Sequence, residues 1–89
     1  MAQELTQVRD ELEKAAETAD DDGLREDIRE HVDAFEDYTV SDHEPDHALM
    51  DEHLNGVRQL SERAEGDTEA HLESALETAE EYREGIDQA

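Results

Sequence analysis

Leucine, isoleucine, valine and phenylalanine are scarce in this chain, yet they recur at intervals of three and four residues along most of its length. Such spacing places side chains on one face of a 3.6-residue helix, so it predicts amphipathic helices. Residues 3–20 show the pattern most clearly, with a stripe formed by Leu5, Val8, Leu12, Ala15, Ala16 and Ala19. No segment alternates apolar and polar residues as a strand does. The chain is therefore predicted to be all-α.

Three further segments carry the same kind of stripe, at residues 23–38, 45–65 and 67–86. The sequence "DDDG" at 20–23 separates the first two, because aspartates and glycine end one helix and cap the next. Gly66 stands where a left-handed residue follows a helix, and Asp67 can cap the last segment. Short connections favour antiparallel neighbours. We predict one domain over residues 1–89, a small antiparallel up-down bundle of four helices, with three helices as the alternative.

The charge of the chain opposes this fold in dilute buffer. Asp and Glu number 29 against 7 Lys and Arg, so the formal net charge is -22. Only 15 of the 89 residues are Leu, Ile, Val or Phe, a composition typical of disordered chains. In about 1 M salt the Debye length is only about 3 Å, which largely removes self-repulsion. Because Lys14 is also the only lysine, the composition indicates adaptation to molar KCl.

The composition also excludes several classes of function. The chain has no cysteine, which excludes disulfides, thiolate zinc sites and cysteine nucleophiles. It has no basic patch for nucleic acid, and anionic membranes would repel it. No signal-peptide pattern and no run of about 20 apolar residues is present. Without a nucleophile elbow or a phosphate-binding loop, we predict neither an enzyme nor a cofactor.

The stretch "SDHEPDHALMDEH", residues 41–53, contains three of the five histidines. Its best local ligand set for a metal is His43, His47 and Asp51, with Glu44 as a further carboxylate. The spacing is permissive rather than specific, since a chain with 29 carboxylates brings many such pairs together. A metal site at these residues is therefore one of two hypotheses.

The second hypothesis is an ordinary helix start. Ser41 and Glu44 match the capping-box pattern, and proline is favoured in the first turn of a helix. Pro45 therefore predicts a helix that begins at residues 44–45. Under this hypothesis the acidic residues of the stretch complement the positive end of the helix dipole.

The remaining histidines lie close to apolar stripes. His53 falls within the stripe of residues 45–65, whereas His31 and His71 are predicted at stripe edges with partly packed rings. Nearby carboxylates are expected to favour the protonated forms of His31 and His71. Gly56 interrupts a helix, for which close helix packing or a mild kink is the expected reason and a functional hinge the alternative.

The second half of the chain resembles a known family. The residues that carry the resemblance are Pro45 to His47, which open a helix, the Gly66–Asp67 break, and the closing residues Tyr82 to Gly85. Together they are similar to a family of small acidic haloarchaeal proteins with no assigned function. The resemblance implies a cytoplasmic helical domain in a high-salt cell, and it supplies no catalytic residues.

These features predict a non-enzymatic scaffold or protein-interaction module. One alternative is a metal-binding protein that uses the 41–53 histidines. Another is an acidic DNA mimic that occupies the groove of a basic protein. A protein partner is expected, direct nucleic-acid and membrane partners are not, and the pattern fits either a monomer or a dimer.

Overall fold

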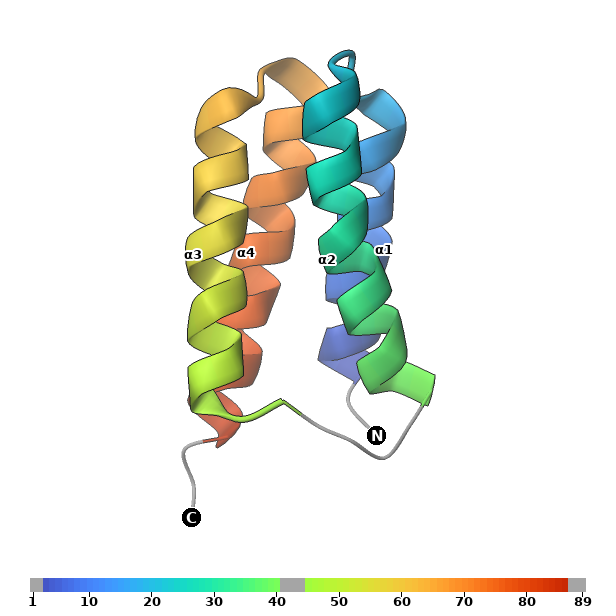
Figure 1. The fold of residues 1–89 in the computed structure, drawn as a ribbon. Helices are drawn as coiled ribbons and strands as arrows, with labels where there is room; N and C mark the ends of the chain where they lie inside the picture. Colours follow the sequence, from blue (N-terminus) through green and yellow to red (C-terminus); the bar gives the residue numbers. More distant parts are fainter. Residues whose placement is uncertain (1–2, 41–44, 87–89) are drawn as a thin grey trace.

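The computed structural model describes residues 3–40 and 45–86, and these residues form four helices. They are α1 (Gln3–Thr18), α2 (Asp22–Val40), α3 (His47–Arg63) and α4 (Gly66–Ile86). The helices stand side by side and alternate in direction (Figure 1). The predicted all-α antiparallel bundle is confirmed, with four helices in the described residues, because α1 ends before "DDDG" and α2 begins within it.

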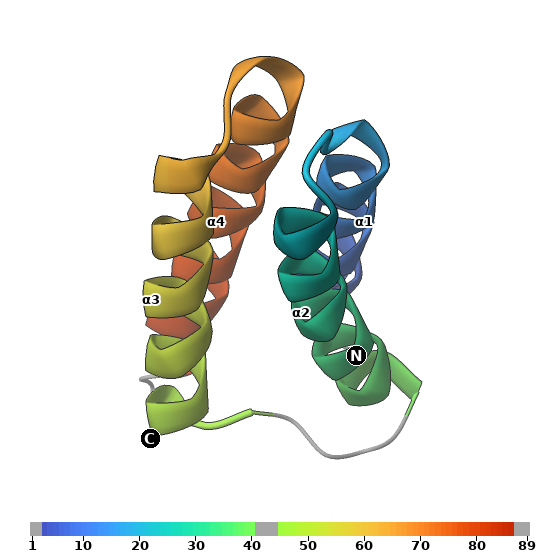
Figure 2. The ribbon, with the colours of Figure 1, turned by 45° about the horizontal axis from the view of Figure 1, so that its top comes forward.

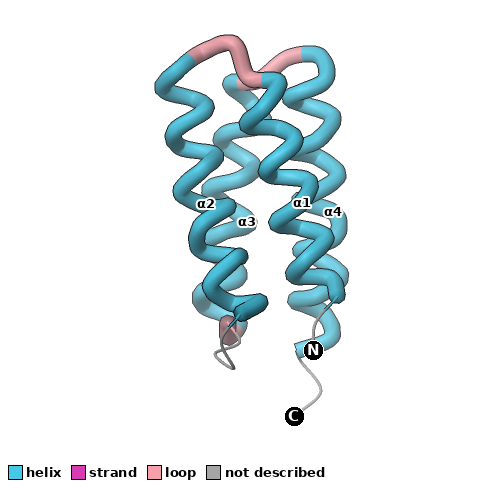
Figure 3. The backbone as a smooth tube through the Cα atoms, turned by 90° about the vertical axis from the view of Figure 1, so that its right-hand side faces the viewer, coloured by secondary structure: helices cyan, strands magenta, loops and turns pink. Residues whose placement is uncertain are grey.

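The four helices form a ring of neighbours. α1 packs against α2 and α4, and α3 packs against α4 and α2. The α1–α4 interface is the most extensive and the α2–α3 interface the sparsest. Figure 2 shows α1 with α2 and α3 with α4 as two hairpins side by side. The two short loops, after α1 and after α3, lie together at one end of the bundle (Figure 3).

The core consists of the predicted stripes. Alanines such as Ala15 on α1 and Ala79 on α4 are among the buried residues, and their small side chains allow neighbouring helices to approach closely. The buried apolar side chains are Leu5, Val8, Leu12, Ala15, Ala16, Ala19, Leu24, Ile28, Phe35, Met50, Leu54, Val57, Leu60, Leu72, Ala75, Ala79 and Tyr82. With few large side chains and many alanines, this core is thin for a domain of this size.

The helix ends follow capping rules, with two differences from prediction. Asp67, expected to cap the last helix, lies within the first turn of α4, which begins at Gly66. Asp21 Oδ2 accepts a hydrogen bond of 2.8 Å from the backbone N–H of Leu24, so "DDDG" does cap the second helix. Gly66 has φ +61°, which confirms the left-handed position expected there. The predicted start of α3 at residues 44–45 is wrong. Asp46 is its N-cap, and its Oδ1 accepts from the N–H of Leu49 at 2.9 Å.

Pro45 therefore precedes the cap of α3, and it is buried. A carboxylate that satisfies a free backbone N–H stabilises a helix start by about 1 kcal/mol, and proline offers no such acceptor. The predicted capping box of Ser41 and Glu44 lies outside the described residues. Within the described ranges, no helix has both the length and the hydropathy that a membrane span requires.

Candidate functional site

Three polar rings cross the sparsest helix interface, between α2 and α3. Nδ1 of His31 on α2 lies 3.0 Å from Nδ1 of His53 on α3. Nε2 of His53 lies 3.0 Å from the hydroxyl oxygen of Tyr38 on α2. All three side chains are half-buried. We call His31, His53 and Tyr38 the ring cluster.

Helical periodicity and one glycine position the ring cluster. His31, Phe35 and Tyr38 lie four and three residues apart, so they share one face of α2. The buried ring of Phe35 packs 4.7 Å from that of His53, centroid to centroid. On α3, a Cβ at Gly56 would lie 2.9 Å from both Cε1 and Nε2 of His31. The close-packing explanation of Gly56 is thus confirmed.

The ring cluster is uncharged at neutral pH. Burial, followed by the charge of His31, lowers the pKa of His53 to about 4. Burial also lowers the pKa of His31, and this effect outweighs the carboxylates of Glu30 and Asp27. The expectation that nearby carboxylates would favour protonated His31 is therefore wrong, because desolvation dominates. Burial similarly raises the pKa of Tyr38.

Neutral rings permit a continuous hydrogen-bond chain. One Nδ1 atom of the histidine pair must carry a proton and the other must accept it. If His53 donates from Nδ1, its Nε2 accepts from the Tyr38 hydroxyl; in the reverse order, its Nε2 donates to that oxygen. A proton can therefore be relayed across the interface, and both nitrogens of His53 are engaged in either case.

The predicted metal ligands are distributed differently. His43 and Glu44 lie outside the described residues. Asp51 is engaged by Arg83, whose Nε donates to Oδ1 at 2.6 Å. His47 is half-buried, and its Nε2 is enclosed with no hydrogen-bond partner among the described residues. Residues 3–40 and 45–86 contain no group of three or more metal-ligating side chains. The metal site at 41–53 stays a prediction.

His71, predicted at a stripe edge, is half-buried on α4. Its Nδ1 lies 3.2 Å from Oε1 of Glu11 on α1. It therefore lies at a different helix interface from the ring cluster and shares no residue with it.

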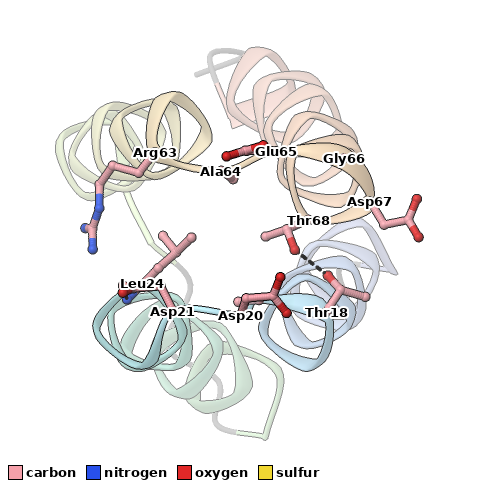
Figure 4. A pocket seen from close by; sticks show the side chains of 11 residues that line it. Thr18, Asp20, Asp21, Leu24, Arg63, Ala64, Glu65, Gly66, Asp67 and Thr68 are labelled. Carbon is pink, nitrogen blue, oxygen red and sulfur yellow. Dashed lines mark hydrogen bonds between the residues drawn. The ribbon is translucent and has the colours of Figure 1, made fainter.

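A polar hollow of about 480 Å³ lies at the loop end of the bundle (Figure 4). The hydroxyls of Thr18 and Thr68 meet across it at 2.7 Å. Because the Thr18 hydroxyl donates to the carbonyl of Ala15 at 3.1 Å, the Thr68 hydroxyl is the donor of this pair. Asp67 points away from the hollow in Figure 4. The lining residues are Thr18, Ala19, Asp20, Asp21, Leu24, Arg63, Ala64, Glu65, Gly66, Asp67 and Thr68.

A second hollow, of about 320 Å³, lies between α3 and α4. Two ion pairs cross it, Arg58 with Glu80 at 3.2 Å and Arg83 with Asp51 at 2.6 Å. Four of its charged side chains are thus already paired with one another. Both hollows are thus polar surface depressions rather than apolar ligand cavities.

The architecture and the ring cluster define a small, acidic, antiparallel four-helix bundle with a polar contact built into one interface. A family model described as a family of unknown function (DUF7553) matches residues 1–85, and the chain belongs to this family. Searches of the curated proteins and of the solved structures found no match to the chain.

Proposed function

We propose that the protein is a non-enzymatic interaction module that works in the salt-rich cytoplasm of a halophilic cell. The observation that carries this proposal is where the exposed large apolar side chains lie. Among the described residues they are Val40, 77% exposed, and Leu49, 36% exposed. One ends α2 and the other lies in the first turn of α3, so both belong to the end of the bundle opposite the short loops. We call Val40 and Leu49 the apolar end.

A high salt concentration favours apolar over charged surfaces as sites of protein binding. Where the Debye length is about 3 Å, charged surfaces no longer attract one another over distance, whereas salting-out ions strengthen apolar contacts. An apolar end on an otherwise charged molecule is then the natural docking point. Its neighbours Glu36, Asp37 and Glu52 are exposed carboxylates. The expected partner is therefore a protein with an apolar anchor flanked by arginine or lysine.

The acidic surface itself supports the salt adaptation. Arg63 of α3 pairs with Asp27 of α2 at 2.8 Å, and Arg58 and Arg83 pair with carboxylates across α3 and α4. Exposed pairs of this kind each contribute about 0–1 kcal/mol. Seven cations leave most of the 29 carboxylates unneutralised. Their solvation by concentrated cations is the condition under which this thin core holds.

A row of carboxylates on α2 is the feature that supports the DNA-mimic alternative, because such a row could imitate phosphates. Asp22, Glu26, Glu30, Asp33 and Asp37 are all exposed, at spacings of four, four, three and four residues. At 1.5 Å per residue this places one charge about every 5–6 Å along the axis. Each strand of duplex DNA carries one charge about every 3.4 Å of helix axis. The lower density of the row favours the interaction module.

The test is affinity capture in molar KCl, followed by binding measurements with the purified partner. Val40→Asp and Leu49→Glu should abolish binding, while the exposed α1 control Glu13→Gln should not change it. If neutralising Glu26, Glu30 and Asp33 abolishes binding and the apolar-end variants retain it, the DNA-mimic alternative replaces this proposal. If no purified protein binds the apolar end, the proposal fails.

A further inference from the structure

We propose that His31 and His53 together bind one divalent transition-metal ion, zinc or copper, through the two Nδ1 atoms that now share a proton. The site would join α2 to α3, the two helices that share the sparsest interface of the bundle. It differs from the set His43, His47 and Asp51, because its second ligand comes from another helix, 22 residues earlier in the sequence.

The distance between the two nitrogens suits this role. A histidine nitrogen binds zinc at about 2.0–2.1 Å, so two nitrogens on one ion lie roughly 2.9–3.4 Å apart for ligand angles between 90° and tetrahedral. The Nδ1 atoms of His31 and His53 are 3.0 Å apart, and their rings meet at 72°. An ion about 2.0–2.1 Å from both nitrogens would lie about 40–45° off the line that joins them, so each ring must turn by roughly that angle to direct its lone pair at the ion.

The surroundings of His53 match those of a metal ligand. A histidine that binds through Nδ1 keeps its proton on Nε2 and usually donates it to a fixed acceptor, which orients the ring. Nε2 of His53 already lies 3.0 Å from the Tyr38 hydroxyl oxygen, which can accept that proton. The ring of Phe35 packs against the same imidazole and limits its rotation.

His31 is held in a different way. The Cε1–Nε2 edge of its ring fills the space that a side chain at position 56 would occupy, so Gly56 fixes the depth of the ring between the helices. Its Nδ1 is thereby held 3.0 Å from Nδ1 of His53.

The charge state is also appropriate. A metal binds neutral imidazole, and both rings are neutral at physiological pH. Glu30 and Asp27 of α2 contribute negative potential at His31, which attracts a dication. No third histidine or carboxylate joins the pair within the described residues, so water would complete the coordination. Imidazole ligands suit copper and zinc, and copper should bind more tightly.

The first experiment is a titration of the folded protein with zinc chloride at neutral pH in about 1 M KCl, followed by NMR of the five imidazole rings. Saturation should occur at one equivalent, with His31 and His53 shifting together. His31→Gln and His53→Gln should each weaken binding roughly tenfold or more. The control variants His47→Gln and His71→Gln should bind as the wild type does.

Electron paramagnetic resonance of the wild-type copper complex gives a readout that does not depend on the folding of any variant. Coupling to two imidazole nitrogens is expected. The inference is overturned if the shifted rings are His43 and His47, if one nitrogen or none couples to copper, or if no titration saturates. Tyr38→Phe, which keeps the ring and removes the acceptor, should weaken zinc binding while the helical circular dichroism stays unchanged.

Discussion

Gly56 on α3 and His31 on α2 fit together so closely that a Cβ on Gly56 would lie 2.9 Å from two atoms of the imidazole. A glycine within a helix costs about 1 kcal/mol relative to alanine. At this position the cost is offset, because the missing side chain lets the His31 ring enter the interface and reach His53. One local defect in α3 thus supports the contact between the two hairpins.

Gly56→Ala tests this relationship. The substitution should lower the free energy of unfolding by about 1 kcal/mol, because the displaced ring costs more than the helix gains. In a His31→Ala background the same change should instead raise it by about 1 kcal/mol. Urea denaturation of the four proteins measures both values. Gly85→Ala is the control, since nothing lies within 4 Å of its added Cβ. Stabilisation by Gly56→Ala in both backgrounds would contradict the close packing of His31 against Gly56.

Acid should weaken the α2–α3 contact. An unfolded histidine titrates near a pKa of about 6.5, whereas burial lowers the pKa of folded His53 to about 4. Between these values the unfolded chain binds more protons, so the free energy of unfolding falls as the pH falls from about 6.5 to about 4. We expect a loss of about 1–2 kcal/mol, allowing for the partial exposure of the ring.

This loss is isolated by comparing denaturation curves of the wild type and His53→Gln across that pH range. Carboxylate protonation affects both proteins equally, and about 1 M KCl screens its effect on repulsion. The free energy of unfolding of His53→Gln should depend less on pH than that of the wild type. Parallel curves for the wild type and His53→Gln would show that this ring is not responsible.

The thin core should respond strongly to truncation. Leu54 is buried on α3, and Leu54→Ala should cost about 2–5 kcal/mol of unfolding free energy, enough to unfold the domain at low salt. Leu49→Ala, on the same helix at a partly exposed position, should change it by less than about 0.5 kcal/mol. Circular dichroism melts at high KCl provide the comparison, and equal effects would mean that the core is assigned wrongly.

Folding should depend on salt. Helical circular dichroism is expected to rise with KCl as self-repulsion of the net charge of -22 is screened. Replacing Glu26 and Glu30 by glutamine and Asp33 by asparagine should lower the KCl concentration at which the helical circular dichroism signal is half-maximal. The opposite control, Arg29→Gln, adds one net negative charge and should raise it. Full helicity in dilute buffer would show that burial of the core outweighs the charge repulsion even when no salt screens it.

The helices and their buried faces could be predicted because the necessary information is local. Positions such as Leu5, Val8 and Leu12 fix a helical face by spacing alone, and the structure buries all three. Asp46 was harder to select as the cap of α3, because several acidic residues and Pro45 compete within six positions. The choice among them depends on backbone geometry that the sequence pattern does not specify.

The ring cluster could not be predicted in the same way. His31 and His53 belong to different helices, and their meeting depends on the register of α2 against α3. The available signal was indirect: His31, Phe35 and Tyr38 at helical spacing on one segment, and His53 followed after three residues by Gly56 on another. Polar rings on core-facing stripes beside a helical glycine indicate a helix contact, but they do not identify the partner.

The extensive α1–α4 interface also has a consequence for how quickly the chain can fold. The first and last helices meet across most of the sequence, so the entropy of closing a long loop must be lost before the principal contact forms. Either hairpin alone lacks that contact. The rate-limiting step should therefore be the docking of α1 against α4. Substitutions that remove the contact between Thr18 and Thr68 should then slow folding more than they accelerate unfolding.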